Sequence, residues 1–363
     1  MRFSILFLFL GFFIPQQVFS SGDSLFTRNQ IHLSYGPGIL WAHRPHMAHL
    51  VGNNTQTFEL DFEHKTKGIK AWQDYYRQPS IGIRLHYGNL GNPSIGNSIG
   101  LLPYFNFNLI SKGAWELRTA WGIGIGFLTK KFDLSANRKH IAIGSNANLF
   151  VSINTNLSYH ITSDFSLGAK AQFTHFSNAA YALPNLGFNV PSFMLMASWD
   201  FMKEAYERPK ILELITFSRK HLQIVGGIGL RSASILNEKR YAVYRLSFEY
   251  FYRPKFKFAL VPSIDLFYNS AIVHRLDQVP ESDAYTYNSQ GGLALTYHQL
   301  VGPVQIYGGM GVYLIDKAKR DGLLYHKLGL RSRLNKKLFM NITLLSHWAK
   351  ADHLQLGLGY IIK

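Results

Sequence analysis

The sequence alternates between apolar residues and small or polar residues with a period of two, in many segments of about ten residues. Over residues 115–127 the odd positions are Trp, Leu, Thr, Trp, Ile, Ile and Phe, and the even positions are Glu, Arg, Ala and Gly. Successive side chains of a strand point to opposite faces, so this period predicts β-strands with one apolar face. The same alternation recurs over 99–109, 147–159, 258–266, 304–314 and 354–362.

The second face of these segments favours a membrane protein over a soluble sandwich. In 147–159 that face consists mainly of Asn and Ser rather than charged residues. Aromatic residues make up 15% of the chain and charged residues only 16%. Apolar residues outside and small polar residues inside are typical of transmembrane β-strands. The predicted fold class is therefore all-β, an antiparallel transmembrane outer-membrane β-barrel.

The first residues predict export of the chain. Arg2 precedes an apolar stretch from Ile5 to Ile14, and Val18-Phe19-Ser20 offers a small residue for cleavage. Because the apolar stretch is too short to span a bilayer, residues 1–20 are interpreted as a secretory signal peptide. The remaining sequence contains no apolar run of helix-spanning length. Strands, rather than helices, would have to cross the membrane.

The charge balance and the absence of cysteine limit the chemistry. The chain has 38 Lys and Arg against 21 Asp and Glu, a formal net charge of +17, and no Cys. Disulfides and thiolate chemistry are excluded. The positive surplus favours anionic partners, either nucleic acid or the phosphates of a membrane surface. Since we find no nucleic-acid motif, we expect the anionic partner to be a membrane surface.

About sixteen strands are expected, in two halves of about eight. Residues 203–221 interrupt the alternation with charges and a proline, and we interpret them as a periplasmic connection. The first half is residues 21–202, and the second, residues 222–363, is expected to be non-catalytic. An even number of strands places both ends of each half in the periplasm. One large barrel is favoured over two tandem eight-stranded barrels, because a single closure pairs every strand edge in lipid.

One constellation of side chains suggests chemistry. His175 and Ser177 are two residues apart and continue the apolar, lipid-facing side of the predicted strand 164–178. Asn189 falls on the same side of the next strand, across a short connection at the extracellular rim. A serine hydroxyl needs an adjacent base, which His175 can supply, and Asn189 can orient that base through its carbonyl oxygen. The Asn178 side chain, or backbone N–H groups after Ser177 such as that of Ala179, can stabilise an oxyanion. The alternative is that His175 and Ser177 only bind lipid head groups.

The motif around these residues resembles a known family. His-x-Ser-Asn-Ala at 175–179, followed by Pro-Asn-x-Gly at 184–187, resembles the outer-membrane lipid A 3-O-deacylase family and the longer acyloxyacyl hydrolase-like proteins grouped with it. The resemblance covers about residues 25–202. It implies that His175 is the base, that Ser177 is the nucleophile and that residues around Asn178 form the oxyanion hole. The family carries a glutamate where this chain has Asn189, and an amide cannot supply the negative charge that would stabilise an imidazolium.

The resulting hypothesis is an outer-membrane serine esterase of a Gram-negative cell that removes a fatty acyl chain from the lipid A of lipopolysaccharide, without metal or organic cofactor. Two alternatives stay open. One is a non-enzymatic porin or structural barrel whose site has decayed, and the other is a phospholipid acyl hydrolase. The interior separates the porin from the enzymes, because a pore needs an open, charged channel and side chains fill an eight-stranded barrel.

Other groups of polar residues can be explained without catalysis. His43, His46 and His49 surround Arg44 and Pro45, and their spacing of three suits no strand face, so we expect a loop that contacts head groups rather than a metal site. His347 is expected inside the barrel. The basic residues at 130–131 and 138–139 could bind lipopolysaccharide phosphates, or form a solvated turn if they are periplasmic.

Overall fold

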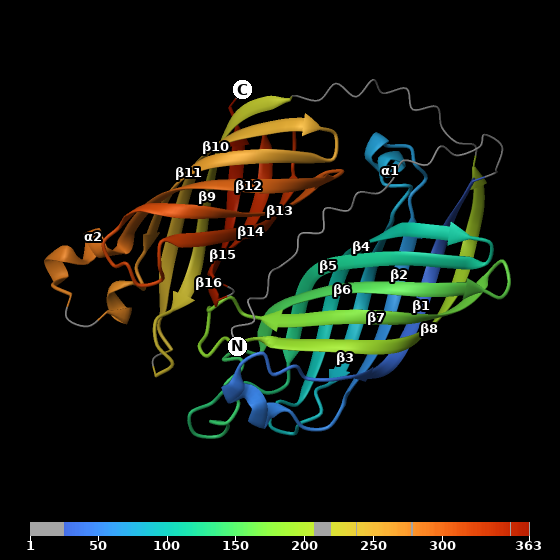
Figure 1. Cartoon of the computed structure of the whole chain (residues 1–363), viewed down its shortest axis with the longest axis horizontal. Coiled ribbons are helices and arrows are strands. Elements are labelled where there is room, and N and C mark those ends of the chain that lie inside the picture. Colours follow the sequence, from blue (N-terminus) through green and yellow to red (C-terminus); the bar gives the residue numbers. More distant parts are fainter. Residues whose placement is uncertain (1–24, 207–218, 237, 277–278, 349, 363) are drawn as a thin grey trace. The chain divides into compact units, whose positions relative to one another are not determined.

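The computed structural model describes residues 25–206, 219–236, 238–276, 279–348 and 350–362 (Figure 1). The predicted signal peptide lies outside these residues, as does most of the predicted connection at 203–221. Of that connection, the structure describes the end of one strand, up to Tyr206, and the start of the next, at Lys220.

The first eight strands form a closed antiparallel barrel in sequence order, drawn in blue to yellow-green in Figure 1. The last strand pairs with the first, with Ile31 opposite Trp199. The strands are β1 (Leu25–Gly38), β2 (Thr55–Lys65), β3 (Ser80–Asn89), β4 (Asn97–Lys112), β5 (Trp115–Leu128), β6 (Ala147–His160), β7 (Phe165–Ser177) and β8 (Phe188–Tyr206).

The next eight strands close into a barrel of their own. Its last strand pairs with its first, with Gly357 opposite Gly227. The strands are β9 (Lys220–Ser232), β10 (Arg240–Lys255), β11 (Phe258–Asn269), β12 (Ser289–Val301), β13 (Val304–Asp316), β14 (Leu324–Arg333), β15 (Leu338–His347) and β16 (Lys350–Ile361).

The preference for one large barrel was therefore wrong, and the chain forms two closed barrels of eight strands each. The prediction rested on the need to pair every strand edge in lipid. The pairing of β8 with β1 and of β16 with β9 meets that need within each half. Edge pairing alone thus does not distinguish one closure from two.

Charged and polar side chains fill the interiors. In the first barrel, Arg84 donates to both carboxylate oxygens of Asp61, at 2.9 Å each, and Lys170 donates to Asp61 at 3.2 Å. In the second barrel, Lys327 donates to Asp265 at 2.8 Å. Arg84 and Lys327 are 2% and 1% exposed. Side chains occupy the interior as expected for eight strands.

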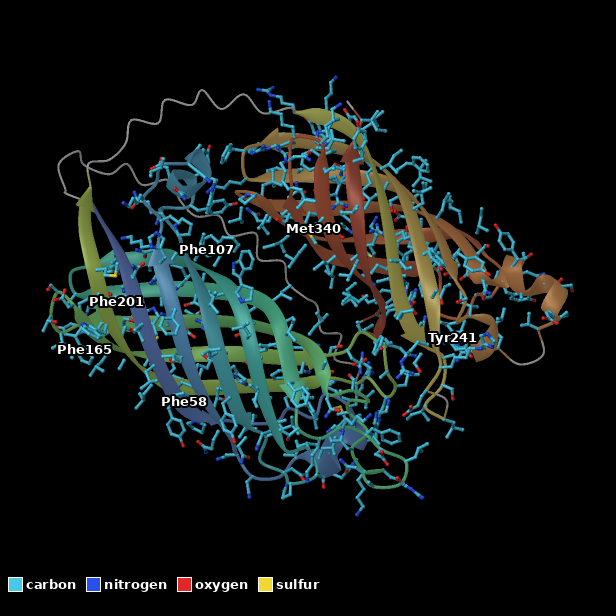
Figure 2. The ribbon with its side chains drawn as sticks, turned by 180° about the vertical axis from the view of Figure 1, so that it is seen from behind. Phe58, Phe107, Phe165, Phe201, Tyr241 and Met340 are labelled. Atoms are coloured by element: carbon cyan, nitrogen blue, oxygen red, sulfur yellow. The ribbon has the colours of Figure 1, made fainter. Side chains whose placement is uncertain are left out.

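The outer faces are apolar. Phe58 and Phe165 lie on the outside of the first barrel and Met340 on the outside of the second (Figure 2), with 42%, 37% and 50% of their surface exposed. The strand β3 alternates strictly between buried and exposed residues. The period of two in the sequence predicted such strands, with one buried and one exposed face.

The connections of the first barrel differ between its two ends. Three of the connections at one end, 39–54, 129–146 and 178–187, are long, and we refer to this end as the loop end. The opposite end holds the tight connections 113–114 and 161–164, the longer connection 66–79 and both termini of the barrel.

Short helices lie in the connections between strands. They are η1 (Pro45–Leu50) between β1 and β2, α1 (Ala71–Tyr75) between β2 and β3, and η2 (Val273–Arg275), η3 (Glu281–Asp283) and α2 (Ala284–Asn288) between β11 and β12. Among the described residues, no helix is both long enough and apolar enough to span a membrane.

Because each half of the chain closes into its own barrel, we predict that the first half folds without the second. Residues 25–206, exported on their own, should form a barrel that migrates faster on a gel before boiling than after, because every strand edge is already paired. A matched segment ending at residue 187 lacks β8 and leaves β1 and β7 unpaired, so it should show no such shift. Failure of residues 25–206 to fold, with the full chain folded, would contradict independent closure.

Candidate active site

The end of β7 presents His175 and Ser177 on the outer face of the first barrel. The inward residues Gln172, Thr174 and Phe176 are buried, whereas His175 and Ser177 are only partly covered. Both lie on one strand face, about 6.6 Å apart along the strand. The structure thus places the two side chains on the predicted face, at the loop end of the barrel.

The aromatic ring of Phe176 fixes which way this strand end faces. The ring is fully buried and stacks on Phe150, with ring centroids 5.0 Å apart and an interplanar angle of 7°. A Cβ atom on Gly126 would lie 2.5 Å from the Phe176 ring, so the absence of a side chain at Gly126 leaves room for that ring. Because Phe176 is held inside, its neighbours His175 and Ser177 must point outward.

Asn189 pairs with His175 across the β7–β8 ladder. The Nδ1 atom of His175 lies 2.7 Å from the Oδ1 atom of Asn189. The residue Asn189 is 8% exposed. An amide oxygen can only accept, so Nδ1 carries the proton in this arrangement and Nε2 keeps its lone pair. His175 is therefore held in the tautomer that a general base for Ser177 requires.

The hydroxyl of Ser177 has partners other than His175. Among the described residues, it donates to Oδ1 of Asn185 at 3.2 Å, and it accepts from Nδ2 of Asn185 at 3.1 Å and from the backbone N–H of Ala179 at 3.2 Å. None of these hydrogen bonds joins Ser177 to His175, and catalytic hydrogen bonds are often incomplete before substrate binds.

The loop after Ser177 gathers hydrogen-bond donors. Ala179 and Ala180 adopt left-handed backbone conformations, with φ of 52° and 60°, which cost energy for residues other than glycine. The backbone N–H of Asn178 donates to Oδ1 of Asn185 at 3.0 Å. The Asn178 side chain itself donates to the hydroxyl of Ser145 at 2.8 Å, which leaves it engaged with another loop.

That other loop, 129–146, holds Asn185 in place. The backbone N–H of Gly144 donates to the carbonyl of Pro184 at 2.7 Å, and that of Leu186 donates to the carbonyl of Ala142 at 2.8 Å. Ile143 forms an isolated bridge with Asn185. The contact between Asn185 and Ser177 was not predicted, although Asn185 is part of the Pro-Asn-x-Gly motif, because a contact made by the fold of a single connection leaves no periodic pattern.

His43 also lies at this site, which spacing did not predict. The Nδ2 atom of Asn189 lies 3.0 Å from Nδ1 of His43. His46 and His49 are exposed and belong to the short helix η1. The β5–β6 connection, which is at the loop end of the barrel rather than at the opposite end, carries the basic residues Lys130, Lys131, Arg138 and Lys139.

The second barrel carries a different cluster. His347 is buried and points inward, with Nε2 at 3.1 Å from the hydroxyl of Tyr313 and Nδ1 at 3.7 Å from Asp352. Asp321, His347 and Asp352 are close enough to share a metal ion. Arg231 and Arg275 form ion pairs with these carboxylates, which neutralises them without a metal.

Two protein-family models match the chain. The model of lipid A 3-O-deacylase (PagL) matches residues 56–198, in the first barrel. The model of the acyloxyacyl hydrolase C-terminal domain matches residues 220–363, in the second. The resemblance inferred from the motif at 175–187 is confirmed at the level of the family. Neither match assigns a catalytic residue.

Several solved structures are similar to the chain. Neisserial surface protein A is 7% identical, with coverage of 48% of this chain and 97% of its own and a TM-score of 0.35. The outer membrane enzyme PagL is 16% identical, with coverage of 46% and 98% and a TM-score of 0.33. CdiB from Acinetobacter baumannii is 9% identical, with coverage of 92% and 60% and a TM-score of 0.19. No curated protein matches the chain.

The buried stack predicts that Phe176→Ala destabilises the barrel. Removing a fully buried ring should lower the free energy of unfolding by about 3–5 kcal/mol, because transfer and cavity terms add. Denaturant titration of the protein in lipid vesicles measures this. Phe193→Ala on the outer face, where Phe193 is 58% exposed, is the matched control and should cost clearly less. Equal losses in the two variants would contradict the anchoring role of Phe176.

Proposed function

The chain belongs to the lipid A 3-O-deacylase family over residues 56–198 and to the acyloxyacyl hydrolase C-terminal domain family over residues 220–363, and on this premise we propose the following activity. The protein is an outer-membrane serine esterase that removes a fatty acyl chain from lipid A. Ser177 is the nucleophile, and His175 is its base. The observation that carries this assignment is the Asn189-held His175 beside Ser177 on the outer face of the barrel.

The proposed reaction proceeds through an acyl-enzyme. The Ser177 oxygen attacks the ester carbonyl while Nε2 of His175 takes the hydroxyl proton, and a tetrahedral oxyanion forms. Collapse of this intermediate breaks the ester C–O bond, and His175 returns the proton to the leaving sugar hydroxyl. Water then attacks the acyl-serine with His175 again as base, which releases the fatty acid and restores Ser177.

Asn185 is the best-placed side chain for the oxyanion. Its Nδ2 atom already lies 3.1 Å from Ser177 Oγ, the atom that becomes bonded to the reacting carbon. The backbone N–H of Ala179 lies 3.2 Å from the same oxygen. Donors this close to the attacking atom are close to where negative charge develops, and they are pre-oriented by the loop contacts. This assignment adds Asn185 to Asn178 and Ala179 as candidate oxyanion residues.

The surroundings of the site favour an ester of a membrane lipid. On β8 the outward residues that follow Asn189 are Pro191, Phe193 and Leu195, and Phe193 and Leu195 are 58% and 72% exposed. An acyl chain lying along this strip stays among apolar side chains while its ester reaches Ser177. The basic residues of loop 129–146 lie at the same end of the barrel and would attract a phosphorylated head group.

The side-chain-filled interior weighs against the porin alternative. Arg84, Lys170 and their carboxylate partners occupy the interior of the first barrel, and these groups are buried. Eight strands leave no room for an aqueous channel once such side chains are in place. A phospholipid acyl hydrolase would use the same site, and the experiment below separates the two substrates.

Mass spectrometry of the lipids of expressing cells tests the proposal. Wild-type protein should produce lipid A lacking one acyl chain, whereas Ser177→Ala should leave lipid A intact, because the nucleophile is removed. Ser346→Ala, at the end of the corresponding strand of the second barrel, is the matched control and should behave as wild type. Identical lipid A in wild type and Ser177→Ala, with both folded, contradicts the proposal. Loss of acyl chains from phospholipids alone would reassign the substrate.

Asn185→Ala should lower kcat by about 10²–10³-fold with little change in KM, because one oxyanion donor is lost. Release of fatty acid from lipid A in detergent micelles gives both constants. Asn146→Ala, in the adjoining loop, serves as the control for disturbance of the loop. An Asn185→Ala protein with wild-type kcat would exclude Asn185 from the oxyanion hole.

A further inference from the structure

The chain that follows β1 runs along β8 as far as the candidate active site. The backbone N–H of Ile39 donates to the carbonyl of Pro191 at 3.0 Å, and that of Trp41 donates to the carbonyl of Asn189 at 2.9 Å. The indole of Trp41 packs edge-on against Phe173, with ring centroids 6.4 Å apart. These contacts extend the β1–β8 pairing beyond the last strand residue, and they deliver His43 to the side chain of Asn189.

The amide of Asn189 joins two imidazole rings. Its oxygen accepts from Nδ1 of His175 at 2.7 Å, and its nitrogen donates to Nδ1 of His43 at 3.0 Å. All three side chains come from the first barrel and its loop end. In this arrangement Nδ1 of His175 carries a proton and Nδ1 of His43 carries a lone pair, so each hydrogen bond has one donor and one acceptor.

An amide differs from a carboxylate in that its two ends are not equivalent. If the Asn189 amide turned over, its NH₂ group would face the N–H of His175, and two donors would oppose each other. Nothing in the His175–Asn189 contact alone prevents this, because an amide fits either way round in shape. A second partner that presents an acceptor to the amide nitrogen favours the productive orientation.

We propose that His43 is a positioning residue that fixes the Asn189 amide with its oxygen toward His175. The proposal rests on the proposed function, in which His175 is the base. The lone pair of neutral His43 accepts the N–H of Asn189. The amide can therefore turn over without losing a hydrogen bond only if His175 and His43 both move their protons between Nδ1 and Nε2. His43 thereby lets an uncharged side chain hold the catalytic tautomer of His175. The residue lies outside the segment matched by the family model, and that match assigns it no role.

Steady-state kinetics of fatty acid release from lipid A in detergent micelles test the proposal. His43→Leu removes the acceptor and should lower kcat about tenfold, which corresponds to about 1.4 kcal/mol, with KM changed less than about twofold. His43→Asn can place an acceptor oxygen near the position of Nδ1 and should recover most of the loss. His46→Leu, in the same loop and exposed, is the matched control.

The Asn189→Asp background separates positioning from a structural role. A carboxylate presents two equivalent oxygens, so His175 keeps its acceptor whichever oxygen faces it. In this background, His43→Leu should change kcat less than about twofold relative to Asn189→Asp alone. A loss of the same size in both backgrounds would make His43 merely structural and would overturn the proposal.

The remaining outcomes are also decisive. Wild-type kcat in His43→Leu overturns the positioning role while the proposed function stands, provided that Ser177→Ala is inactive. Fatty acid release by Ser177→Ala equal to that of wild type overturns both the proposed function and the role of His43. Unchanged heat-dependent gel migration of each variant shows that the barrel is folded.

Discussion

The backbone pairing of each strand edge is the constraint on which the rest of this structure depends. In lipid, every backbone N–H and C=O must find its partner within the protein, so a transmembrane sheet has to close. β8 returns to β1 and β16 returns to β9, which makes two barrels of eight strands. Eight strands enclose only enough space for side chains, and here ion pairs such as Arg84–Asp61 fill it. Chemistry on a bulky substrate is thereby excluded from the interior and has to take place on the outer face or at the rim.

The candidate active site follows from this exclusion. Alternate residues of β7 face opposite ways, so the burial of Phe176 against Phe150 turns His175 and Ser177 outward. The ladder partner of His175 on β8 is Asn189, which brings the acceptor for its ring without any further loop. The remaining groups come from two connections that are hydrogen-bonded to each other, 129–146 and 178–187. A rigid strand thus supplies the candidate nucleophile and base, and fixed loops supply the donors.

The strands and the facing of their residues could be predicted from the sequence because they are periodic. Alternation located the strands, and strand parity placed His175, Ser177 and Asn189 on one face. The number of barrels could not be predicted, since one closure and two satisfy the same backbone groups. The contacts of Asn185 with Ser177 and of His43 with Asn189 could not be predicted either. Asn185 lies 8 residues from Ser177 and His43 lies 146 residues from Asn189. Both contacts depend on loop conformation rather than on a repeating pattern.

The second barrel shows how much depends on strand parity. β15 occupies the place in its barrel that β7 occupies in the first, and it also ends near a histidine. The inward residues of β15 are Phe339, Asn341, Thr343 and Leu345, and His347 continues that buried side. A shift of one residue along a strand moves a side chain from one face of the sheet to the other. His347 therefore meets Tyr313 and Asp352 inside the second barrel rather than pointing to its outer face.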